Sequence, residues 1–78
     1  MSPDEIINAL KVVFAAYSGS LKYLRSRKCE KIIEKFLDQF EELIEHMSLF
    51  PQNMEGYLSL LNAIIQTINS VLGSNICH

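Results

Sequence analysis

The chain has 78 residues and a formal net charge of −2; 49% of its residues are hydrophobic and only 21% are charged. A chain of this length is expected to form one domain, residues 1–78, that buries only about 60% of its unfolded surface, so a single core is marginal without further stabilisation. The charge balance gives no general reason to expect nucleic acid or an anionic membrane as a partner. The apolar composition favours self-association, and we predict a homodimer.

The first predicted helix spans about residues 3–17. Its start is marked by Ser2, whose hydroxyl is placed to accept from the amide of Glu5, and by Pro3, whose missing N–H costs nothing in a first turn. Asp4 and Glu5 also face the positive end of the helix dipole. The sequence therefore predicts a helix that begins at Pro3.

This helix is apolar over most of its circumference, and only Asn8 and Lys11 mark a polar stripe, which predicts burial on more than one side. Gly19 lies between two serines and favours a break. Leu21 and Leu24 nevertheless keep the helical phase, so a helix that continues to residue 24 with a kink is an open alternative.

The central predicted helix spans about residues 26–48, with Ser26 as its N-cap and its end before Pro51. Apolar residues recur at steps of three and four while charged residues fill the other turns, which indicates a helix with one buried face. The apolar positions are Cys29, Ile32, Ile33, Phe36, Phe40, Leu43, Ile44 and Met47. The residues at the stripe centres are expected to form one core, namely Phe36, Phe40, Ile44, Ile64 and Ile68.

The third predicted helix spans about residues 54–72, with Asn53 as its N-cap and Gly73 as a left-handed residue after its end. No residue from Gly56 to Cys77 carries a charge. The face opposite the apolar stripe is polar but uncharged, which suggests partial burial of Ser59, Asn62, Gln66, Asn69 and Ser70. These polar residues argue against a membrane-spanning helix.

Three helices with short connections predict an all-α fold, a three-helix up-down-up bundle. A helical hairpin with a kinked first helix, completed by dimerisation, is the alternative. The dimer interface is expected on the flanks of the first and third helices, at Ile7, Val12, Phe14, Leu58, Leu61, Ile65 and Leu72.

Six of the seven cations lie between residues 22 and 35, and the chain after Lys35 has five acids and no Lys or Arg. This polarity suits antiparallel self-pairing or docking on a charged protein at least as well as nucleic acid. Glu30 and Glu34 stand among the cations, so nucleic acid is the less favoured partner. We predict a docking site for a charged partner at the junction before the central helix, formed by Lys22, Arg25, Arg27 and Lys28.

The sequence shows no catalytic arrangement and no glycine-rich phosphate loop, and we predict no enzyme activity, no cofactor and no metal site. His46 lies in the last turn of the central helix, where it complements the dipole. Cys29, Cys77 and His78 fall at the same end of such a bundle, so a disulfide or a partial metal site is conceivable. The favoured interpretation is that Cys29 is a small buried hydrophobe and Cys77 lies on a frayed tail.

In size, helix content and a C-terminal cysteine, the chain is similar to the small secreted helical dimers of the secretoglobin family. That family places its other cysteine near the N-terminus, whereas here it is Cys29, so only the idea of a disulfide-linked helical dimer is kept as an alternative. No N-terminal stretch has the form of a signal peptide, and we expect a cytoplasmic protein; a mature secreted form would look the same.

The expected function is a non-catalytic protein–protein interaction or dimerisation module with a regulatory or adaptor role. Two alternatives stay open. One is a helical dimer that carries a small apolar ligand, and the other is a phosphate-contacting nucleic-acid regulator that uses Arg25, Arg27 and Lys28.

Overall fold

The computed structural model describes residues 2–78 and contains no strand within that range. The predicted all-α class with three helices is confirmed. In chain order the elements are helix α1 (Pro3–Ser20), the 3-10 turn η1 (Leu21–Tyr23), helix α2 (Arg27–Leu49), the 3-10 turn η2 (Pro51–Asn53) and helix α3 (Met54–Leu72).

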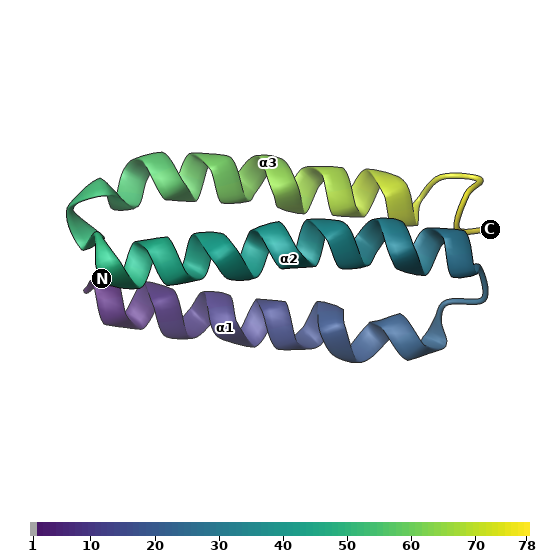
Figure 1. Ribbon diagram of the computed structural model, residues 1–78, viewed down its shortest axis with the longest axis horizontal. Helices are drawn as coiled ribbons and strands as arrows, with labels where there is room; N and C mark the ends of the chain where they lie inside the picture. The colour runs from purple at the N-terminus through teal and green to yellow at the C-terminus, as the bar shows by residue number, and fades with distance from the viewer. Residues whose placement is uncertain (1) are drawn as a thin grey trace.

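Helix α2 lies between the other two helices (Figure 1). Both α1 and α3 pack against it along an elongated molecule of 39 × 19 × 17 Å. The two ends of the chain lie at opposite ends of the long axis (Figure 1). The central helix therefore supplies the surface on which both neighbours are assembled, which agrees with its strongly two-faced sequence.

The predicted N-cap of α1 is confirmed, because the Glu5 amide donates to Ser2 Oγ at 3.3 Å. The helix continues through Gly19 and ends at Ser20, whose hydroxyl donates to the Tyr17 carbonyl at 2.7 Å. The chain then tightens into η1 and becomes extended at Leu24. Helical structure thus extends beyond residue 17, and the glycine does not break it.

The start and end of α2 follow local rules. Ser26 Oγ accepts from the Cys29 amide at 3.1 Å, so the predicted cap is confirmed. At the other end Phe50 has left the helical region, with φ −130° and ψ 65°, immediately before Pro51. The helix ends there because proline disfavours a helical conformation in the residue before it.

Helix α3 has the predicted bounds and Asn53 and Gly73 occupy its cap positions, but neither residue has the predicted cap geometry. Asn53 makes no side-chain cap hydrogen bond, because it closes η2 with φ −101° and ψ 21° and lacks the extended backbone that an N-cap needs. Gly73 has φ −86°, so it is not left-handed. The chain after it keeps turning with right-handed geometry, and the Ser74 amide donates to the Val71 carbonyl at 3.0 Å.

The core consists of two clusters along α2 instead of the single cluster predicted. Phe40, Ile44 and Ile68 are buried as expected, but Phe36 and Ile64 are only half-buried. Because α2 has a neighbour on each side, the residues midway between the two neighbours are covered best. The first cluster is Ile7, Phe40, Ile44, Met47 and Leu61. The second is Cys29, Ile33, Leu37 and Ile68.

A search of residues 2–78 for a helix that is long and apolar enough to cross a membrane finds none. The polar residues of α3 interrupt the only long uncharged stretch of the sequence.

Candidate functional site

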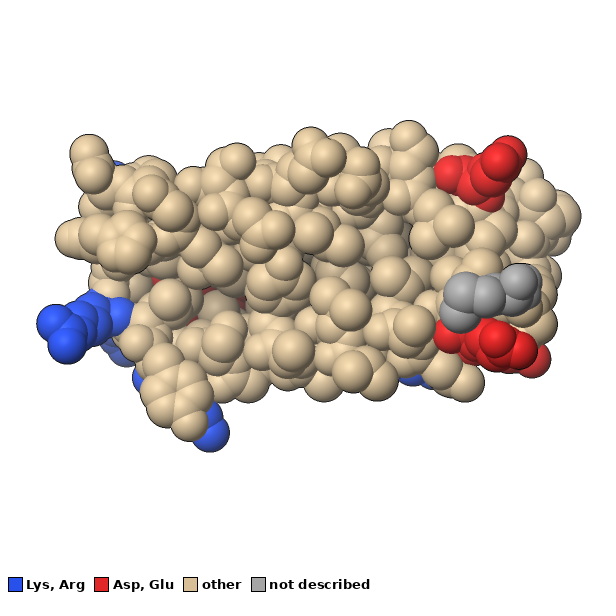
Figure 2. Space-filling view, turned by 180° about the vertical axis from the view of Figure 1, so that it is seen from behind, with Lys and Arg blue, Asp and Glu red and all other residues tan. Residues whose placement is uncertain are grey.

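On the face of the molecule drawn in Figure 2, charges gather at the two ends. Figure 2 shows the face behind that of Figure 1, with α3 along the upper edge and α1 along the lower edge. On this face Lys and Arg cluster at one end, Asp and Glu at the other, and the broad area between them is almost free of charge. The view therefore presents both predicted features at once, an electrically polarised molecule and an uncharged surface.

The four cations of the predicted docking site lie around one connection. Lys22 is in η1, Arg25 is in the linker, and Arg27 and Lys28 open α2; all four are exposed. The Lys22 ammonium lies 5.3 Å from the centre of the Tyr23 ring. Tyr23 is itself 76% exposed. The basic junction, Lys22–Lys28, therefore presents an aromatic ring within a group of cations.

The structure separates the predicted interface residues into three groups. Ile7 and Leu61 belong to the first core cluster and are already covered within the chain, so neither is available to a partner. Val12 is 70% exposed. The remaining four are half-buried, namely Phe14, Leu58, Ile65 and Leu72.

Helix α1 keeps a second apolar surface that no other helix covers. Ala9, Val12, Val13 and Ala16 are all exposed and recur at steps of three and four, so they form one stripe. We call these four residues the α1 stripe. The sequence predicted burial of α1 on more than one side, and within a single chain this prediction is wrong because the helices that α1 packs against leave the α1 stripe exposed.

The polar face of α3 is exposed, not partly buried as predicted, at Ser59, Asn62, Gln66, Asn69 and Ser70. Asn69 still has a tertiary role, because its Oδ1 accepts a 2.9 Å hydrogen bond from the Tyr17 hydroxyl. This bond joins α1 directly to α3. Val13 lies one helical turn before Tyr17, so the α1 stripe borders the seam between these two helices.

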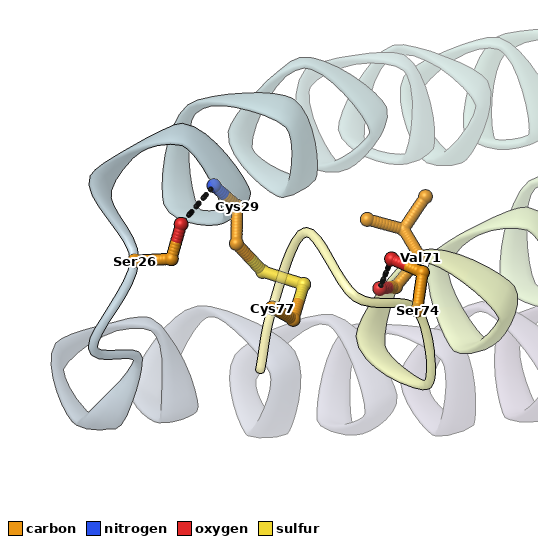
Figure 3. The surroundings of a disulfide bond; sticks show 5 residues. All are labelled: Ser26, Cys29, Val71, Ser74 and Cys77. Atoms are coloured by element: carbon orange, nitrogen blue, oxygen red, sulfur yellow. Dashed lines mark hydrogen bonds between the residues drawn. A yellow bond between two sulfur atoms is a disulfide. The ribbon is translucent and has the colours of Figure 1, made fainter.

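Cys29 and Cys77 form a disulfide with a Cα–Cα distance of 5.1 Å (Figure 3). The favoured prediction of a frayed tail with a free Cys77 was therefore wrong. Sequence reasoning had noted that the two cysteines share one end of a bundle, but one sequence with two cysteines could not show that the tail returns to α2. The bond holds the tail beyond Leu72 against the start of α2 (Figure 3).

Hydrogen bonds within the tail shape this return. Ser74 Oγ donates to the Val71 carbonyl at 2.6 Å (Figure 3), and the Cys77 amide donates to the Ser74 carbonyl at 3.2 Å. Cys29 is fully buried beside Ile33 and Ile68. Both sulfurs are used in the bond, which removes the alternative of a Cys–Cys–His metal site. Within residues 2–78, no group of three His, Cys, Asp or Glu side chains is placed to hold a metal ion.

Two grooves flank α2 near its C-terminal half. One groove, of about 680 Å³, lies between α1 and α2. Its apolar part is lined by Phe14, Ile44 and Leu49, and its rim by Lys11, Glu41 and Glu45. The other, of about 350 Å³, separates α2 from α3 and is lined mainly by Leu43, Leu60, Ala63 and Ile64. His46 borders this second groove and meets the Tyr57 ring edge-on, with ring centres 6.0 Å apart. Sequence reasoning missed both grooves.

Comparison of the chain with protein-family models, with curated proteins and with solved structures finds no match in any of the three. The function is therefore argued from the surfaces of the molecule.

Proposed function

We propose that this chain is a non-catalytic protein-interaction module that acts as a homodimer of up-down-up three-helix bundles. The observation that carries the proposal is the uncharged face formed by α1 and α3, with the exposed α1 stripe at its border. Solvated faces of small soluble domains normally carry mixed charges, and a large uncharged surface with exposed apolar residues usually marks an interface.

The α1 stripe suits pairing with its own copy. Alanine and valine are small, so two such helices can approach closely and exclude water from the contact. A two-fold axis that runs the helices antiparallel brings the basic end of one copy near the acidic end of the other. The same arrangement run in parallel would place like charges together, so the polarity of the molecule favours the antiparallel form.

A matched pair of substitutions tests this dimer. Ala16→Glu places a charge in the α1 stripe, whereas Ala15→Glu places the same charge on an exposed position outside it. At physiological salt and micromolar concentration, where the salt-sensitive association described below is weakened, we expect light scattering to give twice the chain mass of 8.9 kDa for the wild type and Ala15→Glu, and a single chain mass for Ala16→Glu. A wild-type mass of one chain, with a melting temperature independent of protein concentration, would overturn the proposal.

We also propose that the protein works in an oxidising compartment, in place of the cytoplasmic location expected from the sequence. The support is the Cys29–Cys77 bond, because disulfides persist outside the cytosol and supplement small domains that cannot build a large core. Alkylation of the protein in its native source without reductant should leave both cysteines unmodified. Two alkylated cysteines would contradict this location.

The groove between α2 and α3 favours a second candidate function, the carriage of a small apolar ligand. Leu60 is 56% exposed at its rim, where an apolar molecule would cover it. An environment-sensitive apolar dye should then bind the folded protein and be lost in Leu60→Gln. Ile76→Gln is the matched control, because Ile76 is 42% exposed and lines neither this groove nor the one between α1 and α2. Equal dye binding by both variants would exclude this site.

A further inference from the structure

The groove between α1 and α2 combines two chemical properties. Its apolar part contains Ile44, which is buried, and Phe14, which is half-buried, while Leu49 at its end is exposed. The carboxylates of Glu41 and Glu45 stand exposed on the α2 side and Lys11 lies on the α1 side, so the rim carries a net charge of −1. An occupant that fits this groove carries an apolar or aromatic group for the floor and cations for the rim.

The basic junction of the same chain has these properties. Its Tyr23 ring projects into solvent. Lys22 precedes Tyr23 in the sequence and lies beside its ring, and Arg25 and Arg27 follow it. An exposed tyrosine has a flat apolar body and a polar tip, and tyrosine and arginine are the residues most often found at the centres of protein interfaces.

The junction cannot reach the groove of its own chain. Arg27 and Glu45 are in the same helix, eighteen residues apart, which places them about 27 Å from each other at ~1.5 Å per residue. A rigid helix keeps this separation. Only another molecule can bring a basic junction into the groove.

We propose that the basic junction of one copy docks into the α1–α2 groove of a second copy. Tyr23 covers the apolar floor at Phe14 and Leu49, and the cations of the junction face Glu41 and Glu45. This contact uses a different surface from the α1 stripe, so it joins one dimer to the next and extends the dimer into larger assemblies. Because the contact is largely between exposed charges, salt weakens it.

Charge reversal provides the test. The groove-reversed variant is Glu41→Lys with Glu45→Lys, and the junction-reversed variant is Arg25→Glu with Arg27→Glu. We expect the wild type to form species larger than the dimer in sedimentation velocity at low salt, and each variant alone to lose them. A one-to-one mixture of the two variants should restore them, because each then meets an oppositely charged partner. Circular dichroism checks that both variants fold.

Two controls keep this result separate from the proposed homodimer. Glu42→Lys with Glu55→Lys makes the same change in net charge outside the groove and should keep the larger species. The Ala16→Glu variant lacks the stripe contact but should still show the salt-sensitive association between single chains. A carbodiimide should also cross-link Lys28 of one isotope-labelled copy to Glu41 or Glu45 of an unlabelled copy.

The docking proposal is overturned if the wild type forms no species beyond the dimer at low salt. It is equally overturned if the mixture of reversed variants fails to assemble while both are folded. In either case the groove would be left to a basic amphipathic segment of a different protein. Neither outcome affects the α1 stripe, whose test is the mass difference between Ala15→Glu and Ala16→Glu.

Discussion

The Tyr17 hydroxyl donates a 2.9 Å hydrogen bond to Asn69 Oδ1, across 52 positions of sequence. It links the two helices that flank α2, near the end of the molecule where the disulfide also lies. The apolar body of Tyr17 packs on the second core cluster, so the bond extends a buried contact to the surface. It therefore helps to set how far α1 and α3 stand apart on the uncharged face.

The first prediction concerns this bond. Tyr17→Phe removes the hydrogen-bond donor while keeping the ring. We expect the free energy of unfolding to fall by about 0.5–1 kcal/mol, because the net contribution of such a hydrogen bond is small and this one is exposed. Asn69→Ala should cost a similar amount. Chemical denaturation of the two single variants, the double variant and the wild type gives a double-mutant cycle of unfolding free energies. Strictly additive losses would show that the two side chains do not interact in solution.

The second prediction concerns the disulfide. The Cys29–Cys77 bond closes a segment with a sequence separation of 48, for which the loop-entropy relation gives about 4 kcal/mol of stabilisation. Cys77→Ser should therefore lower the free energy of unfolding by roughly 2–4 kcal/mol. The wild type should fall to nearly the same value in reductant, whereas the variant should not respond to reductant. An equal response of the two proteins would mean that the bond is absent.

The third prediction concerns the centre of the core. Phe40 is fully buried and its ring lies 5.8 Å from that of Phe14. Phe40→Ala should cost about 3–5 kcal/mol, a large part of the roughly 5–15 kcal/mol available to a small domain, and abolish a cooperative melt. Phe50→Ala is the matched control and should cost much less, since Phe50 is about half exposed. Similar melts for both variants would contradict the register of α2.

The fourth prediction compares two helix starts. Ser26→Ala should destabilise the protein by about 1 kcal/mol, because Ser26 Oγ accepts from the Cys29 amide. Asn53→Ala should be nearly neutral, because the Asn53 side chain caps nothing. Thermal melts of the two variants beside the wild type measure the difference. The reverse order of melting temperatures would show that the caps are assigned incorrectly.

The fifth prediction concerns the basic junction. If it serves a protein surface, the isolated protein should not retard mixed DNA or RNA at physiological salt. Lys22 is partly engaged with the Tyr23 ring, and the acids Glu30 and Glu34 follow within two turns of α2, which lowers the local positive potential. Micromolar binding that weakens steeply with salt, and that Arg25→Glu with Arg27→Glu removes, would favour the nucleic-acid alternative.

Much of the helix content could be predicted because it depends on neighbours in sequence. Ser2 and Ser26 accept from amides three residues ahead, and Phe50 leaves the helix because proline follows it. The absence of a side-chain cap at Asn53 and of a left-handed conformation at Gly73 also has a local cause. A 3-10 turn leads directly into α3, and the chain after α3 keeps a right-handed conformation. The residue types alone do not distinguish these two backbone conformations from those of the commoner helix caps.

Which residues form the candidate surfaces could not be predicted in the same way, because it depends on how the helices pack. The sequence shows that α1 is apolar nearly all round, but it does not show which of its faces α2 covers. The predicted interface therefore combined Val12, which is exposed, with Ile7 and Leu61, which are core residues. The spacing of apolar residues shows which of them share one face of a helix. Only the packing of the neighbouring helices decides which of these faces stays exposed to solvent.

By itself the sequence determined the helical class, the central role of α2 and the concentration of cations near its start, since periodicity, capping and charge order are properties of the chain. Only the tertiary structure decided that Cys77 returns to Cys29, that Tyr17 meets Asn69, and that an acid-rimmed groove opens beside Phe14. Each of these features joins residues far apart in sequence, and their meeting depends on how the helices pack and on the path of the tail, which no local pattern encodes.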